Sequence, residues 1–147
     1  MSSDDGKPID FDVVREPWQK YELNDTSILK VKYVLTRLWK KIQDNKPSYR
    51  IDGQTHTVML IPPELRGPID TRTYSKEELE SSIVQDEVRY NTISEEWYEY
   101  IVDDGTRIRL KMTVTRIAKT SKFDRQGEPV YLVDNNVLLQ VRPPKLN

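Results

Sequence analysis

The sequence predicts a mainly β protein made of two tandem, similar units, each a small barrel or sandwich of about five strands, joined by a short α-helix. The first observation behind this prediction is an internal repeat, because a shift of 79 positions lays residues 16–38 over residues 95–117 without a gap. The second is the alternation of apolar and polar residues in short segments that turn residues separate. The identical positions in the two copies are Trp18/Trp97, Tyr21/Tyr100, Asp25/Asp104, Lys32/Lys111, Thr36/Thr115 and Arg37/Arg116. Such a repeat indicates one folding unit used twice, through an internal duplication.

The length of the chain limits how each unit can be stabilised. The 147 residues suffice for one ordinary domain or for two very small ones. A unit of about 55 residues has a marginal core on its own, so we expect the two units to pack on each other or on copies from other chains. The expected organisation is a flexible polar arm at 1–7, repeat one at 8–65, a linker containing the helix at 66–86 and repeat two at 87–144.

Each repeat is expected to begin with two short strands. Ile9–Val13 alternates apolar and polar residues, and residues 88–92 keep much of that alternation. A second strand follows the tryptophan of each copy and ends at a turn. In the second copy Asp103–Thr106 contains an Asp-Gly pair, which suits a tight hairpin turn. Asn24–Ser27 has no glycine, so a looser turn is expected in the first copy.

The third strand of each repeat has the clearest pattern. Residues 29–36 and 108–115 alternate, so that one set of side chains points to the core and the other points to solvent. An arginine followed by an apolar residue, at 37–38 and again at 116–117, breaks the alternation. We therefore expect a β-bulge or a bend at this point in both copies.

A closing hairpin is expected to end each repeat. In the first copy residues 49–61 would turn at Asp52-Gly53, and in the second copy residues 130–141 would turn at 134–136. A diproline follows each of these segments and would terminate its last strand, because proline cannot continue a ladder.

The expected helix lies between the repeats. Ser75 followed by Glu78 fits a capping box, and Tyr74 with Leu79 fits a hydrophobic staple around it. Leu79 and Ile83 give one apolar stripe. These residues predict a short helix of about residues 76–85.

The sequence carries no pattern typical of an enzyme. It has no cysteine and a single histidine, His56, in a predicted strand. It also lacks a phosphate-binding loop, a dinucleotide fingerprint and the ligand spacing of a zinc site. We therefore expect no catalytic residues, no metal site, no cofactor and no small-molecule substrate.

The distribution of apolar residues bears on location. No apolar run is long enough to span a membrane, and the start of the chain, Met-Ser-Ser-Asp-Asp-Gly, has no signal-peptide character. The sequence therefore predicts a cytoplasmic protein without a membrane partner.

The leading functional hypothesis is a non-enzymatic structural or adaptor subunit, which binds protein in a homo-oligomer or a larger complex. Trp39 is the first candidate contact, because its counterpart in the second copy is Ala118 and a large apolar residue absent from one copy suggests a contact surface. Val34, in the outer row of the third strand, and Phe11, next to the acidic N-terminal arm, are the other candidate partner-binding residues.

The alternative, from a different class, is a single-stranded nucleic-acid-binding protein. Its candidate contacts are basic residues on the predicted outer or bend positions of both copies: Lys30, Lys32, Arg37, Arg109, Lys111 and Arg116. Trp18 and Trp97 could offer stacking faces beside them, although burial in the core is the favoured interpretation for both tryptophans. Basic residues on a solvated strand face also protect a sheet from edge pairing, and the net charge of −1 argues neither for nor against a polyanionic partner.

The string Trp-x-x-Tyr followed by Asp-Gly-Thr, which runs from Trp97 towards Pro144 and more loosely through repeat one, resembles small uncharacterised prokaryotic β-domain proteins, here duplicated in tandem. That resemblance implies a β fold and carries no activity with it. A weaker similarity links the bent strands after the Asp-Gly turn to Sm-type barrels. The Asp/Asn-containing loop with which that family reads bases is not recognisable in this sequence.

Overall fold

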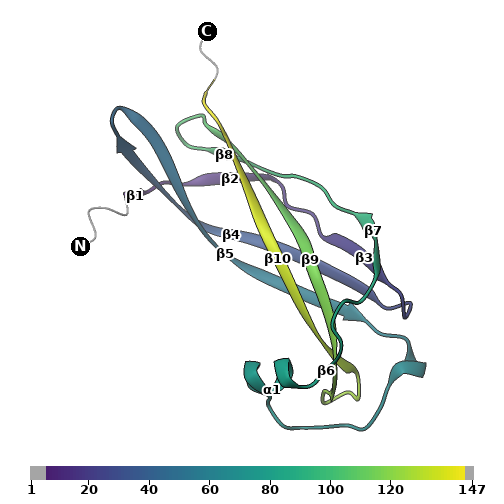
Figure 1. Ribbon diagram of the computed structural model, residues 1–147. Helices are drawn as coiled ribbons and strands as arrows, with labels where there is room; N and C mark the ends of the chain where they lie inside the picture. Colours follow the sequence, from purple (N-terminus) through teal and green to yellow (C-terminus); the bar gives the residue numbers. More distant parts are fainter. Residues whose placement is uncertain (1–5, 145–147) are drawn as a thin grey trace.

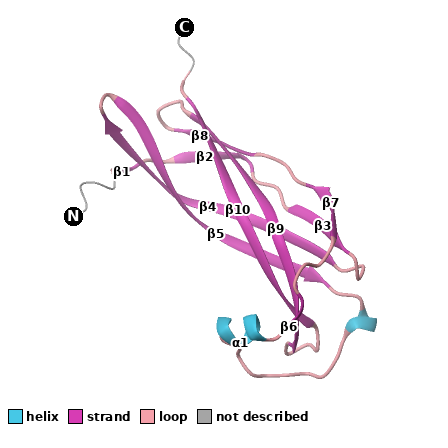
Figure 2. Cartoon of the chain, viewed as in Figure 1, coloured by secondary structure: helices cyan, strands magenta, loops and turns pink. Residues whose placement is uncertain are grey.

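The computed structural model describes residues 6–144 as a β structure with little helix (Figures 1 and 2). The strands are β1 (Lys7–Pro8), β2 (Phe11–Arg15), β3 (Gln19–Leu23), β4 (Ile28–Gln43), β5 (Lys46–Leu60), β6 (Ile83–Gln85), β7 (Tyr90–Ser94), β8 (Tyr98–Val102), β9 (Arg107–Phe123) and β10 (Pro129–Arg142). A 3-10 turn at Pro63–Leu65 and the helix α1 (Lys76–Ser81) lie between β5 and β6. The predicted mainly β class is therefore confirmed.

The strands form two antiparallel sheets of five strands each. In the first sheet, β4 pairs with β5 along one side and with β3 and β1 along the other, and β7 pairs with β3. In the second sheet, β9 pairs in the same way with β10, β8 and β6, and β2 pairs with β8. The two long hairpins, β4–β5 and β9–β10, cross each other and carry their turns at opposite ends of the molecule (Figure 1).

The two sheets exchange one strand. β2 belongs to the first half of the chain but pairs with β8, and β7 belongs to the second half but pairs with β3. The sheets therefore do not follow the expected boundaries of 8–65 and 87–144. The exchange occurs at the segments before β3 and β8, where the side chain of Gln19 donates to the Glu96 carbonyl at 2.8 Å and accepts from the Glu96 N–H at 2.8 Å. The side-chain amide of Gln19, in the first half of the chain, thus holds the crossover segment at Glu96 in the second half.

The predicted bulge is confirmed in both long strands. Thr36 is the extra residue between the pairs Leu35–Gly53 and Arg37–Asp52. Thr115 is its counterpart in β9, where the register shifts opposite Asp134 and Asn135. The bulge brings Leu38 and Ile117, each two residues further on, back to the core, so the buried face continues beyond the break in alternation.

The predicted turns at Asp52-Gly53 and 134–136 are wrong, because β5 and β10 run through these residues without interruption. These residues lie opposite the bulges of the neighbouring long strands. The first hairpin turns instead at Asp44 and Asn45, whose φ angles of 55° and 64° fit a two-residue turn.

Two apolar clusters fill the space between the sheets, and each draws on both halves of the chain. The first contains Tyr21, Leu23, Leu29, Val31, Val88, Met112, Val114 and Ile117. The second contains Leu35, Leu38, Tyr98, Tyr100, Val102, Ile108 and Leu110. A shift of 79 positions carries Tyr21 onto Tyr100 and Leu29 onto Ile108, so corresponding residues of the two copies lie in opposite clusters. Neither half contains a complete cluster.

The linker folds at one end of the sheets. At its helix, Ser75 Oγ accepts from the Glu78 N–H at 3.1 Å, and the Glu78 carboxylate accepts from the Ser75 N–H at 3.3 Å. The helix ends at Ser81, earlier than predicted, because Ile83–Gln85 pairs with β9 as β6. None of the helices described between residues 6 and 144 has the length and apolar character to cross a membrane.

Candidate functional site

The two repeated tryptophans lie outside the apolar clusters, on the outer faces of different sheets. Lys30 and Lys32 lie over the Trp18 ring, with Nζ 4.8 Å and 5.8 Å from its centroid. The second copy repeats this arrangement with Arg109 and Lys111 over the Trp97 ring, at 4.6 Å and 5.7 Å. The predicted core position of both tryptophans is therefore wrong. Each half-buried ring instead packs against the stems of basic side chains and attracts their charges.

Carboxylates lie beside two of the six basic residues that the sequence suggests for nucleic-acid binding. Lys111 Nζ lies 3.9 Å from Glu95 Oε1. Arg116 forms ion pairs with Asp86 and with Asp134, the latter at 3.3 Å. Hydrogen bonds to Asp86 and Asp134 raise the pKa of Arg116 above its usual range. The basic row of β9 therefore carries its own counter-charges.

Two of the three predicted partner-binding residues share one hollow of about 530 Å³, and the third lies elsewhere. Trp39 and Phe11 both line it, beside the bulge at Thr36. The Arg50 guanidinium stacks 3.8 Å from the Trp39 ring centroid, and the Phe11 ring meets the core ring of Tyr100 edge-on at 5.7 Å. Val34 is half-buried on β4 and does not line this hollow. Arg37 lies at the rim of the same hollow.

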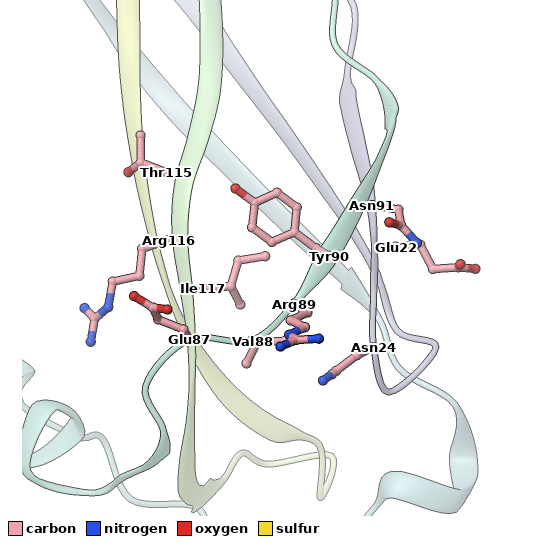
Figure 3. A pocket seen from close by; sticks show the side chains of 10 residues that line it. All are labelled: Glu22, Asn24, Glu87, Val88, Arg89, Tyr90, Asn91, Thr115, Arg116 and Ile117. Carbon is pink, nitrogen blue, oxygen red and sulfur yellow. The ribbon is translucent and has the colours of Figure 1, made fainter.

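A second hollow, of about 780 Å³, occupies the corresponding place in the other half (Figure 3). It is lined by Glu22, Asn24, Glu87, Val88, Arg89, Tyr90, Asn91, Thr115, Arg116 and Ile117. Positions 8–11 and 36–38 of the first hollow correspond to 87–90 and 115–117 of the second. Tyr90 is the central ring, and its hydroxyl donates to the Val114 carbonyl at 2.9 Å. The lining mixes both charge signs with apolar residues and selects no single ligand chemistry.

Two equivalent clusters of Asp, Lys and Tyr side chains were not predicted from the sequence. Each cluster joins residues from the two halves of the chain. Asp104 Oδ2 accepts from Lys40 Nζ and from Tyr49 Oη, both at 2.6 Å. In the other copy Asp25 accepts from Tyr131 and lies 3.6 Å from Lys119 Nζ. Burial acts to raise the pKa of Asp104, but the hydrogen bonds from Lys40, Tyr49 and Thr106 outweigh it and hold that pKa well below its usual range. Every polar atom of these clusters serves a contact within the chain, so the clusters are structural.

Within residues 6–144, no group of three or more His, Cys, Asp or Glu side chains is placed to hold a metal ion. His56 is exposed on β5.

β10, which the sequence predicts only as a closing strand, carries a run of exposed apolar side chains. Leu138, Leu139 and Val141 of β10 are 50%, 41% and 41% exposed. In the described part of the chain β10 pairs with β9 alone, so its other edge carries free backbone groups. In β5, the positions that match Leu138 and Leu139 by register are His56 and Thr57. The uncharged run from Asn135 to Val141 was the signal available in the sequence.

Comparisons of the chain with protein-family models, curated proteins and solved structures found no match.

Proposed function

We propose that the protein is a non-enzymatic structural or adaptor subunit that assembles with protein partners. One observation carries this proposal, namely the exposed, uncharged and apolar edge of β10 between Asn135 and Val141. An open strand edge offers a row of backbone donors and acceptors to another chain, and apolar side chains beside it add buried area. Natural sheets usually protect such an edge with charges or prolines, and this segment has neither.

The difference between the two copies supports the same proposal. The register matches Asn135–Val141 with Gly53–Met59 of β5. There Thr55, His56 and Thr57 stand in place of Val137, Leu138 and Leu139, and the exposed Val58 stands in place of Gln140. The register along both long hairpins is otherwise the same, so the fold does not require leucines at 138 and 139. Residues that are apolar, exposed and unnecessary for the fold are typical of an interface.

The proposed duplication gives this subunit its framework. β2 and β7, β3 and β8, and β4 and β9 begin at positions that differ by 79. The two clusters contain corresponding residues, each taken from the opposite half. We propose that the chain is a fused pair of β units that exchange one strand, as two subunits of a dimer would, with the linker and its helix added between them.

Single-stranded nucleic-acid binding is the weaker candidate. Lys30 and Lys32 alternate with core residues of the first sheet, and Arg109 and Lys111 alternate with core residues of the second. The two basic rows therefore belong to different outer faces and do not build one groove. Cations already cover the Trp18 and Trp97 rings, which reduces the ring area left for a base. Salt-sensitive binding of an oligonucleotide that the joint Ala substitution of these four residues abolishes would reverse this ranking.

The decisive experiment compares matched variants in the native host. A tagged chain is cross-linked in cells, and the recovered complexes are compared for wild type, Leu138→Asp/Leu139→Asp and His56→Asp/Thr57→Asp. The proposal expects complexes with wild type and with the β5 variant, and their loss with the β10 variant. Equal recovery with all three chains, or no complex with any, would rule out the β10 edge as an assembly surface.

A further inference from the structure

We infer that the partner of the β10 edge is a second copy of this chain, paired antiparallel about a two-fold axis through Leu138. This inference rests on the proposed function, since it names the partner of the same edge. A two-fold axis makes the contact isologous, so each residue of β10 meets its mirror position on the other copy.

The charges of β10 are complementary in this register. Asp134 lies four residues before Leu138 and Arg142 lies four residues after it. Antiparallel pairing centred on Leu138 therefore sets Asp134 opposite Arg142 of the second copy, twice by symmetry. Directly opposed side chains of unlike charge stabilise a pair of strands, and like charges destabilise it. The Asp134 side chain remains 59% exposed despite its contact with Arg116, so its carboxylate is open to a second cation.

The side chains between the charged ends also match. On the outer face Leu138 meets itself, and Asn136 meets Gln140, whose carbonyl oxygen already accepts from Arg109 at 3.2 Å. The amide of Gln140 therefore keeps its donor hydrogens for Asn136 of the second copy. On the inner face Val137 meets Leu139, so the apolar side chains of both copies come together.

The corresponding strand of the other half lacks this complementarity. Centring β5 in the same way on His56 sets Asp52 opposite Leu60 and Gly53 opposite Met59. Neither pair brings opposite charges together. The complementary pattern therefore belongs to β10, and pairing there joins the two second sheets into one continuous sheet of ten strands.

The absence of cysteine from the sequence permits a direct test of the register. Leu138→Cys should form a disulfide-linked dimer under mild oxidation, because opposed residues across an antiparallel pair lie within disulfide reach. Asn136→Cys is the matched control, since in this register it faces Gln140 and not itself. The mixture of Asn136→Cys with Gln140→Cys should cross-link into heterodimers. Equal and slow cross-linking of Leu138→Cys and Asn136→Cys would overturn the inference.

A charge exchange tests the same contact without cross-linking. Arg142→Asp sets two carboxylates opposite each other, and the mass of the wild-type dimer, measured by light scattering in the micromolar range, should fall to that of the monomer. Asp134→Arg combined with Arg142→Asp restores opposite charges and should restore the dimer. Thermal unfolding of each variant shows that the chain is still folded. A folded double variant that stays monomeric would contradict the inference.

The outcomes separate this inference from the function on which it rests. A wild-type chain that stays monomeric, with Leu138→Cys uncross-linked, overturns self-pairing. If Leu138→Asp/Leu139→Asp still loses its cellular complexes in that case, the adaptor function stands with another protein at the same edge. If the cellular complexes are unaffected as well, both proposals fail.

Discussion

Tyr100 donates a hydrogen bond from its hydroxyl to Oε2 of Glu16 at 2.7 Å, although the two residues are 84 positions apart. The same carboxylate oxygen accepts from the Leu35 N–H at 3.1 Å. Glu16 follows β2 directly, at the point where the chain crosses between the sheets. In the other copy Tyr21 donates to Glu95 at 2.6 Å, and Glu95 follows β7. Each crossover is therefore anchored by a tyrosine of the opposite half.

Tyr100→Phe should lower the free energy of unfolding by about 1.5–3 kcal/mol, because a fully buried hydroxyl bonded to a carboxylate is lost. Urea unfolding followed by circular dichroism measures the change. Tyr90→Phe is the matched control, since it removes a hydroxyl bonded to a neutral backbone carbonyl and should cost about 0.5–1.5 kcal/mol. A Tyr100→Phe effect no larger than that of Tyr90→Phe would show that the Glu16 contact contributes little.

The exchanged strands predict that the halves depend on each other. Residues 1–75 and 76–147, produced separately, should each fail to fold as a monomer, because each apolar cluster takes its residues from both halves. Either half should remain unfolded or pair with a copy of itself. Mixing the two should give a heterodimer with the circular dichroism spectrum of the intact chain.

Size-exclusion chromatography with light scattering distinguishes these states. A half that unfolds cooperatively as a monomer is the result that this prediction forbids, and it would mean that one unit completes its own core.

Some of this fold could be predicted from the sequence because local patterns determine it. The alternation in residues 29–36 specifies a strand with one buried face, and the arginine at 37 marks the bulge. The capping box at Ser75 specifies where α1 begins. Each of these features depends on residues that are near one another in the chain.

The strand exchange could not be predicted in this way. The alternation in β2 requires an apolar neighbour on one face but does not say which half supplies it. The turn predicted at Gly53 is wrong for a related reason, because an Asp-Gly pair fits both a tight turn and a close approach of another strand. The size of Trp18 favours a core position, whereas Lys30 and Lys32 hold its ring on the outer face.

The site was predictable only in part. The sequence predicts Trp39 and Phe11 as separate contacts, and the structure brings them into one hollow. The edge of β10 could not be predicted, because whether a strand lies at an edge depends on the order of strands in the sheet.

Asp104 should make the stability of the protein sensitive to acid. Its pKa in the folded state lies below the ordinary value of 3.8, so the unfolded state binds more protons as the pH falls. The stabilisation is complete above about pH 5 and is lost as the pH falls through the folded-state pKa. Asp104→Asn should therefore lower the free energy of unfolding at neutral pH and make that free energy depend less on pH below about pH 5.

Urea unfolding at a series of pH values gives this profile. Asp103→Asn is the control for net charge, because it removes the same charge from an exposed position of the same turn. If Asp104→Asn and Asp103→Asn gave the same profile, the cluster with Lys40 and Tyr49 would not be its source.

Gly53→Ala should destabilise the chain by about 1–3 kcal/mol through overpacking. A β-carbon at this position would lie 2.4 Å from the Val34 carbonyl oxygen and 2.6 Å from the Tyr33 ring.

The matching position of β10 is Asn135, which lies opposite Val114 as Gly53 lies opposite Leu35. Position 135 has room for the side chain of Asn135, because Met112 occupies the place that Tyr33 takes in the first half. Asn135→Ala should therefore change stability by less than about 0.5 kcal/mol, and thermal and urea unfolding of both variants provide the comparison. Equal losses in the two variants, or none in Gly53→Ala, would show that the Tyr33 ring and the bulged strand can move aside, and that glycine is not required opposite the bulge.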